Sequence, residues 1–181
     1  MTGRIAIAIL VLGTSAAAAT AETASQSYWL FLRNDGYTWC GYRDSSAFKS
    51  AVADMTPMES GRVVFSSKKL LEVTYQITPE SGDWIVIDQY TTSDDTFLLR
   101  RTNLLAQANL QIVQEAAIRE GKATPFRLVT VTTPDGQKAK APPTLDFPAV
   151  PVLTNLARIP FMAIVDEMRK RSMSELCKKP E

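Results

Sequence analysis

Residues 70–78 alternate between apolar and polar side chains, and this alternation limits the fold of the chain more than any other feature. The apolar positions are Leu71, Val73, Tyr75 and Ile77, and the polar ones are Glu72, Thr74, Gln76 and Thr78. Because successive side chains of a β-strand point to opposite faces, the pattern predicts a strand with one buried and one solvated face. Such strands are typical of antiparallel sheets.

Further strand-like runs lie on both sides of this segment, and turn residues separate them. Asn34-Asp35-Gly36 stands between two aromatic-rich runs, which is a hairpin pattern, and Pro79-Glu80-Ser81-Gly82 follows residue 78. We therefore expect strands at residues 28–33, 37–43, 62–66, 83–91, 96–102 and 126–133.

Three segments have helical patterns instead. Asp44-Ser45-Ser46 supplies capping residues for a short helix that ends near Ala53. The longest helix is expected from Leu104 to Glu120, with Gly121 as its stop, and residues 160–173 predict a last amphipathic helix.

The expected fold class follows from this order of elements. It is α+β: a single domain with a largely antiparallel curved sheet packed against one long helix, a short N-terminal helix and a C-terminal helix. The apolar face of residues 70–78 is expected to pack under the long helix at Leu105, Ala108 and Ile112.

The first 21 residues have the layout of a secretory signal peptide. Arg4 gives a basic start, Ile5 to Ala19 form an apolar run, and Ala19-Thr20-Ala21 is a small-residue cleavage site. The run is too short to span a bilayer. We therefore expect the mature chain, residues 22–181, to be a single exported domain without a transmembrane segment, located in a periplasm or secreted.

The chain has two cysteines, Cys40 and Cys177, near opposite ends of the mature segment. In an oxidising compartment this count predicts a disulfide between them. A free or redox-active thiol and an intermolecular bond are the alternatives, although no Cys-x-x-Cys spacing marks a redox pair.

Composition excludes several classes of function. The chain has no histidine, so catalytic triads that use His and zinc or haem sites that use imidazole are excluded. Arg4 is the only charge in the expected signal peptide, and without it the acidic and basic side chains balance, which argues against nucleic acid as a partner. We assign no catalytic residue, no metal site and no cofactor.

Two weaker patterns could carry chemistry. Carboxylates gather around the expected turns at Glu80, Asp83, Asp88, Asp94 and Asp95. A pair of them could hydrolyse glycosides or bind calcium, but the calcium-loop pattern is missing and turns commonly hold hydrated carboxylates. The Ser-x-x-Lys spacings that begin at Ser46 and Ser66 lack the partner motifs of penicillin-binding enzymes.

Two segments are candidates for contact with a partner. Six aromatic residues lie between positions 28 and 42, and Trp29 and Trp39 could anchor a glycan or a peptide if their rings are exposed. Packing in the core is the alternative role for these rings. The basic residues 169–171, Lys178 and Lys179 could bring the C-terminal helix to a membrane surface or an acidic partner.

These observations favour a small exported, non-enzymatic binding or accessory protein whose ligand is a protein, a glycan or an apolar molecule. One alternative is a cavity protein for a lipid or another apolar small molecule, since a curved sheet closed by a helix can enclose a pocket. Another is a His-free enzyme that depends on carboxylates or lysine.

Overall fold

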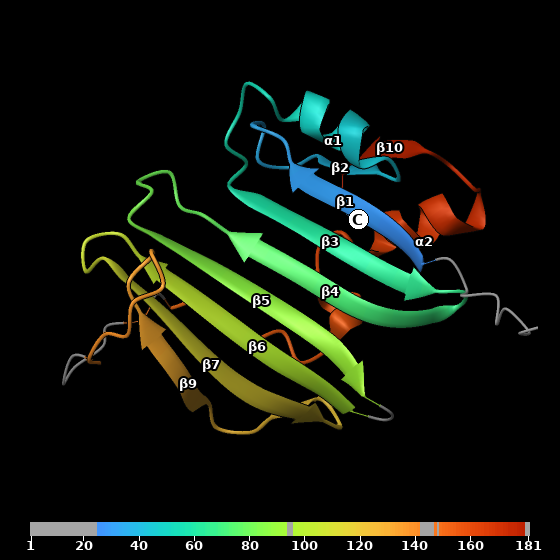
Figure 1. The fold of residues 1–181 in the computed structure, drawn as a ribbon. Coiled ribbons are helices and arrows are strands. Elements are labelled where there is room, and N and C mark those ends of the chain that lie inside the picture. The colour runs from blue at the N-terminus through green and yellow to red at the C-terminus, as the bar shows by residue number, and fades with distance from the viewer. Residues whose placement is uncertain (1–24, 94–95, 142–146, 148, 180–181) are drawn as a thin grey trace, which may run out of the picture.

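The computed structural model describes residues 25–93, 96–141, 147 and 149–179. The expected signal peptide therefore lies outside the described residues. Within them, the dominant feature is an antiparallel sheet of ten strands in the order β10-β2-β1-β3-β4-β5-β6-β7-β8, with β9 also paired to β7 (Figure 1).

The strands and helical elements of the described chain have the following bounds. The strands are β1 (Ser25–Leu32), β2 (Trp39–Tyr42), β3 (Glu59–Ser66), β4 (Lys69–Ile77), β5 (Trp84–Ser93), β6 (Thr96–Leu105), β7 (Leu110–Arg119), β8 (Lys122–Ala123), β9 (Arg127–Thr132) and β10 (Glu175–Lys178). The helical elements are α1 (Ser45–Ala51), the 3-10 turn η1 (Leu156–Arg158) and α2 (Met162–Lys170). No helix in the described part of the chain is long and apolar enough to cross a membrane.

The two ends of the described chain meet at one edge of the sheet. β1 lies between β2 and β3, because the chain turns back from β1 into β2, passes through α1, and returns on the other side of β1 as β3. β3 to β7 then form a continuous meander. The last strand, β10, returns to pair with β2 at the edge.

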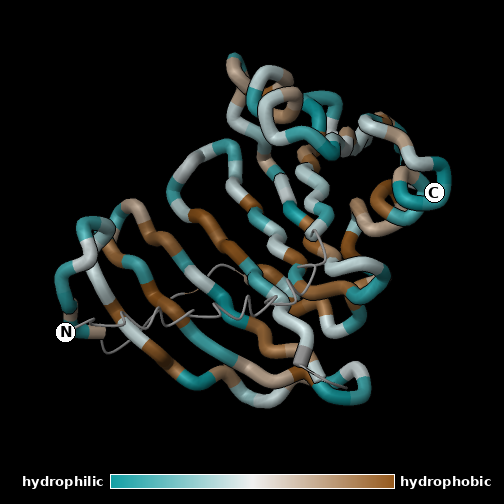
Figure 2. The backbone as a smooth tube through the Cα atoms, turned by 45° about the vertical axis from the view of Figure 1, so that its right-hand side comes forward, coloured by the Kyte–Doolittle hydropathy of each residue, from teal (hydrophilic) through white to brown (hydrophobic). Residues whose placement is uncertain are grey.

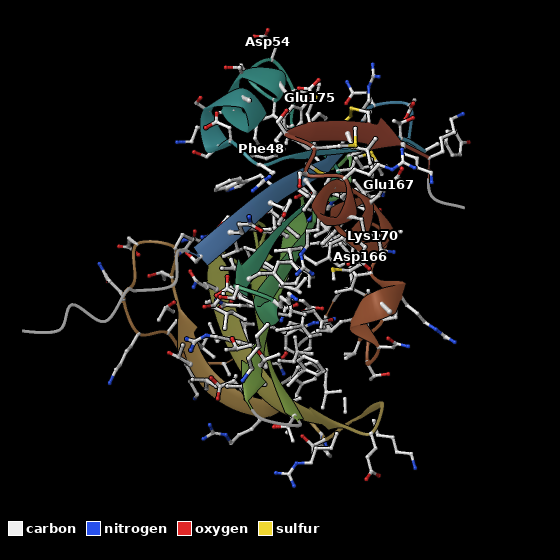
Figure 3. All side chains as sticks on the ribbon, turned by 90° about the vertical axis from the view of Figure 1, so that its right-hand side faces the viewer. Phe48, Asp54, Asp166, Glu167, Lys170 and Glu175 are labelled. Atoms are coloured by element: carbon white, nitrogen blue, oxygen red, sulfur yellow. A yellow bond between two sulfur atoms is a disulfide. The ribbon has the colours of Figure 1, made fainter. Side chains whose placement is uncertain are left out.

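The core lies between the inner face of the curved sheet and the segment that contains η1 and α2. Figure 3 shows α2 against this face, whereas α1 lies at the other side of the β1–β2 end. Apolar and polar residues alternate along several strands, as the tube in Figure 2 shows, and in β3 and β4 every second residue near the middle of the strand is buried. From the other side Leu156, Ile159, Phe161, Ile164, Val165 and Met168 complete the core.

Phe161 makes the closest approach between the two layers. Its ring centroid lies 5.1 Å from that of Trp39 and 5.6 Å from that of Tyr75. Beneath it is Gly61 of β3, where an added Cβ would lie 2.4 Å from the ring. The residue at position 61 is therefore glycine because a side chain would collide with Phe161.

The expected α+β arrangement with one long helix is wrong, because the structure is mostly antiparallel sheet and its two α-helices are short. The segment from Leu104 to Glu120 is the end of β6, a turn at residues 106–109, and β7. Asn109 adopts a positive φ of 49° in this turn, a conformation that asparagine tolerates better than most residues. Gly121 does not stop a helix: with Glu120 it forms the two-residue turn between β7 and β8, both at positive φ.

The other expected elements are present at their predicted positions. The strands correspond to β1 to β6 and β9, the short helix to α1, and the last amphipathic helix to α2. Asp44 caps α1, since its carboxylate accepts a hydrogen bond from the Ala47 amide.

The alternating strand is confirmed as β4, but it packs under residues of η1 and α2 rather than under a long helix. Val73 and Tyr75 are buried, and Ile77 packs at the margin of the core. Leu71 departs from the expectation because the β3–β4 register shifts between Val64 and Phe65. This bulge pairs Leu70 with Phe65, and Leu70 instead of Leu71 contacts the core.

Candidate ligand-binding site

The predicted disulfide between Cys40 and Cys177 is confirmed. The two residues face each other on β2 and β10, with their Cα atoms 4.1 Å apart, and are separated by 137 positions in the sequence. No free cysteine remains among the described residues. A disulfide of this kind fits a protein of an oxidising, extracytoplasmic compartment.

Most rings of the aromatic hairpin serve packing. Tyr28 and Trp39 are buried on the inner face of the sheet. Phe31 and Tyr42 lie on the outer face, where both contact Phe48 of α1, the helical residue labelled in Figure 3. The rings are therefore divided between two faces and do not form one aromatic surface.

The two tryptophans that sequence analysis singled out are also separated. Trp39 is only 2% exposed and belongs to the core. Trp29 is half-buried, and its ring lies 5.9 Å from the Arg62 guanidinium. Because Trp29 alternates with the inward-facing Tyr28 and Leu30, it lies on the outer face and cannot act together with Trp39.

The aromatic residue that the hairpin does expose is Tyr37, with 69% of its surface accessible. It follows the turn at Asn34-Asp35-Gly36 and stands at a cavity of about 450 Å³, which we call the hairpin cavity. The cavity is lined by Leu32, Gly36, Tyr37, Trp39, Glu59, Pro160 and Lys179. Tyr37 is thus an exposed ring beside an apolar wall that the core holds in place.

Charged groups stand on the walls of the hairpin cavity. The Lys179 Nζ atom lies 5.8 Å from the centre of the Tyr37 ring. The Glu59 carboxylate accepts a hydrogen bond from the Tyr75 hydroxyl. Burial, together with this hydrogen bond and the charge of Glu59, raises the pKa of Tyr75 well above its usual value. The phenol therefore stays protonated and continues to hold Glu59 in place.

A second cavity, of about 430 Å³, adjoins the first. It is lined by Ala157, Arg158, Ile159, Pro160, Ala163, Ile164, Lys178 and Lys179, and we call it the basic cavity. Pro160 and Lys179 line both cavities. The Lys178 ammonium lies 3.4 Å from Glu167 of α2, which also binds Arg171.

The buried carboxylate of the sheet has a structural role. Asp88 accepts hydrogen bonds from the Nε and Nη2 atoms of Arg101, both at 2.7 Å. Arg101 also donates from Nη1 to the Val150 carbonyl oxygen at 2.8 Å, which ties the segment before η1 to the sheet. Tyr90 contacts the same carboxylate, and burial raises the pKa of its hydroxyl. The charges of Asp88 and Arg101 therefore neutralise each other inside the protein.

The remaining candidates are spread over the surface. Asp94 and Asp95 lie outside the described residues, and no group of three metal-binding side chains occurs in the described ranges. Ser46 donates its hydroxyl hydrogen bond to Asp44. In the basic C-terminal segment, the Arg169 guanidinium lies 3.7 Å from the centre of the Phe65 ring, and Arg171 pairs with Glu167.

Sequence analysis named two lining residues, Trp39 and Lys179, as separate candidates but did not bring them into one site, because the lining comes from separated segments. The lining residues come from the hairpin turn, β3, the residues before α2 and the residue after β10: Tyr37, Glu59, Pro160 and Lys179. A further signal is Tyr37, a large ring directly after a polar turn, where solvent exposure is expected.

Comparison with known proteins identifies no family for this chain. No protein-family model, curated protein or solved structure matches it significantly. The site is therefore interpreted from its own residues.

Proposed function

We propose that the protein is an exported, non-enzymatic binding protein that holds its ligand in the hairpin cavity. The observation that carries this proposal is the exposed Tyr37 ring at the wall of a cavity of about 450 Å³. Binding sites for small molecules typically have volumes of about 300–1,000 Å³ and apolar walls with a few polar groups. The hairpin cavity has both properties.

The walls of the cavity favour binding because they are held before a ligand arrives. Trp39 is fixed by its contacts with Phe161 and Tyr75, and Glu59 is fixed by the Tyr75 hydroxyl. Ligand binding then needs little ordering of these side chains, which lowers its entropic cost. Tyr37 adds an exposed ring that a bound molecule can contact.

The chemistry of the lining favours binding over catalysis. Among the described residues that line the cavity, Glu59 is the one carboxylate, and none is a serine, threonine or cysteine. A carboxylate-dependent hydrolase generally needs a second acid or a nucleophile near the first. The arrangement instead offers an apolar surface with one acidic and one basic group.

The proposal is tested with a neutral fluorescent probe, N-phenyl-1-naphthylamine. The folded protein should bind this probe saturably, and Tyr37→Ala should weaken binding about tenfold, as expected when an aromatic anchor is truncated. Leu98→Ala is the matched control, because Leu98 is also exposed but lies on β6, away from the cavity. Equal affinity of Tyr37→Ala and wild type, or no saturable binding, would contradict the proposal.

A further inference from the structure

The hairpin cavity and the basic cavity together form one groove. They share Pro160 and Lys179, so a molecule that passes over these two residues contacts both. The hairpin cavity contributes the Tyr37 ring and the edge of Trp39, and the basic cavity contributes Ala157, Ile159, Ala163 and Ile164. The groove therefore offers a continuous apolar surface longer than either cavity alone.

The basic cavity holds more positive charge than the hairpin cavity does. Arg158, Lys178 and Lys179 all line the basic cavity. Lys178 is paired with Glu167, which is already shared with Arg171. In the described ranges of the chain, Arg158 and Lys179 have no carboxylate oxygen within 4 Å. The basic cavity is therefore complementary to an anionic group.

The uncharged residues of the groove narrow the class of ligand further. Among the described residues, neither lining contains an asparagine, glutamine, serine or threonine side chain, and Tyr37 supplies the one hydroxyl. A glycan or a peptide main chain needs several directed hydrogen bonds, which in this groove would come from the charged side chains and Tyr37 rather than from neutral polar groups. An alkyl chain needs only apolar contact, and its charged end needs only a counter-charge.

We infer that the groove binds a single-chain amphiphile with an anionic head group. The head lies between Arg158 and Lys179 in the basic cavity, and the alkyl chain runs over Pro160 toward Tyr37 and Trp39. This inference rests on the proposed function, because it assigns a ligand class to the same site. It adds the basic cavity to that site and assigns the ligand an orientation along the groove.

The test compares twelve-carbon amphiphiles that differ in their head groups. Laurate, dodecyl phosphate, dodecanol and dodecyltrimethylammonium are titrated, each below its critical micelle concentration, against protein loaded with N-phenyl-1-naphthylamine. Both anions should displace the probe at concentrations at least about fivefold lower than dodecanol, and the cation should be weakest. A difference of this size is expected when a partly exposed charge gains a counter-charge.

Substitutions then locate the head group. Arg158→Gln and Lys179→Gln should each weaken laurate binding about three- to fivefold, and each should weaken it by a larger factor than it weakens dodecanol binding. Added salt should weaken the binding of laurate but not of dodecanol. Lys122→Gln is the matched control, because Lys122 is an exposed lysine on β8, far along the sheet from β10.

Three results would overturn the inference while leaving the proposed function intact. Equal displacement of the probe by laurate and dodecanol would contradict the preference for an anionic head group. Bound probe that no amphiphile displaces would contradict the assignment of amphiphiles as the ligand class. Displacement by hexaglutamate as effective as by laurate would assign the basic cavity to a peptide. Failure of the probe itself to bind would instead contradict both proposals.

Discussion

At the scale of single residues, Arg101 is a buried charged side chain that links two separate segments of the chain. It is 7% exposed and joins the Asp88 carboxylate on the neighbouring strand to the main chain at Val150. A buried ion pair gains little overall, since desolvation offsets most of its attraction, but removing one partner leaves an uncompensated charge. Its stabilising effect therefore depends on both partners being present.

Arg101→Met should lower the free energy of unfolding by about 3–5 kcal/mol, because Asp88 then remains buried without a partner. The double variant Arg101→Met with Asp88→Leu should recover a large part of this loss. Urea denaturation of wild type and both variants measures the difference. If the single and double variants are equally unstable, the penalty does not come from the stranded Asp88 charge.

Asp35 is the second residue whose charge matters, because it shapes the hairpin turn before Tyr37. Its carboxylate accepts hydrogen bonds from the Thr38 hydroxyl at 2.7 Å, the Thr38 amide at 2.8 Å and the Tyr37 amide at 2.9 Å. These bonds, that of the Thr38 hydroxyl first, lower the pKa of Asp35 from 3.8 to about 2. The turn is thus stabilised by the ionised form.

A folded-state pKa below the unfolded value gives stability that is present above pH 3.8 and is lost as the pH falls toward 2. The free energy of unfolding of wild type should therefore exceed that of Asp35→Asn most above pH 4, and the difference should shrink toward pH 2. Chemical denaturation of both proteins across this range measures it. A difference that does not change with pH would show that the Asp35 charge is not responsible.

At the scale of elements, sequence patterns located most strands but not the one that decides the fold class. Alternation was clear in β4 because one face of that strand is solvated. In β7 it was hidden, because the strand is rich in alanine, glutamine and glutamate, which are good helix formers, and carries the buried Val113 on its outer face. Pairing with β6 on one side and β8 and β9 on the other overrides that local preference.

The candidate site was less predictable than the fold, for a different physical reason. Burial of Trp39 depends on Phe161, which lies more than a hundred positions later in the sequence. The sequence alone shows where the aromatic residues are, but it does not show which ring is covered by a segment that is distant in the sequence. Tyr37 could be separated from the other rings only by its position next to a turn.

The contact between Gly61 and Phe161 can be used to test how the start of α2 packs on the sheet. Gly61→Ala should lower the free energy of unfolding by about 1–3 kcal/mol, because the added methyl overlaps the ring. Phe161→Leu in the same chain should relieve part of this effect. Thermal or urea unfolding measures both, with Ser60→Ala on the opposite face as control. Equal effects at positions 60 and 61 would mean that the ring does not rest on β3.

At the scale of the whole molecule, the disulfide fastens the last strand to one of the first. Denatured, unreduced mature protein should show no titratable thiol. Cys177→Ser should lower the free energy of unfolding by up to about 5 kcal/mol, the value that the chain-entropy model gives for a loop of this length. Thiol titration and urea denaturation with and without reductant measure the two effects. Two free thiols in the unreduced protein would contradict the bond.

The position of β10 in the sequence also determines when the sheet can be completed during synthesis. Its partner β2 precedes most strands of the described sheet, but β10 follows all of them in the sequence. Until β10 has been synthesised, Cys40 therefore lacks its disulfide partner, and one side of β2 is an unpaired edge. An unpaired edge readily adds a strand from another chain. Among the strand pairings of the described sheet, that of β10 with β2 is thus the last that the growing chain can form, and the disulfide then links two strands that are already paired.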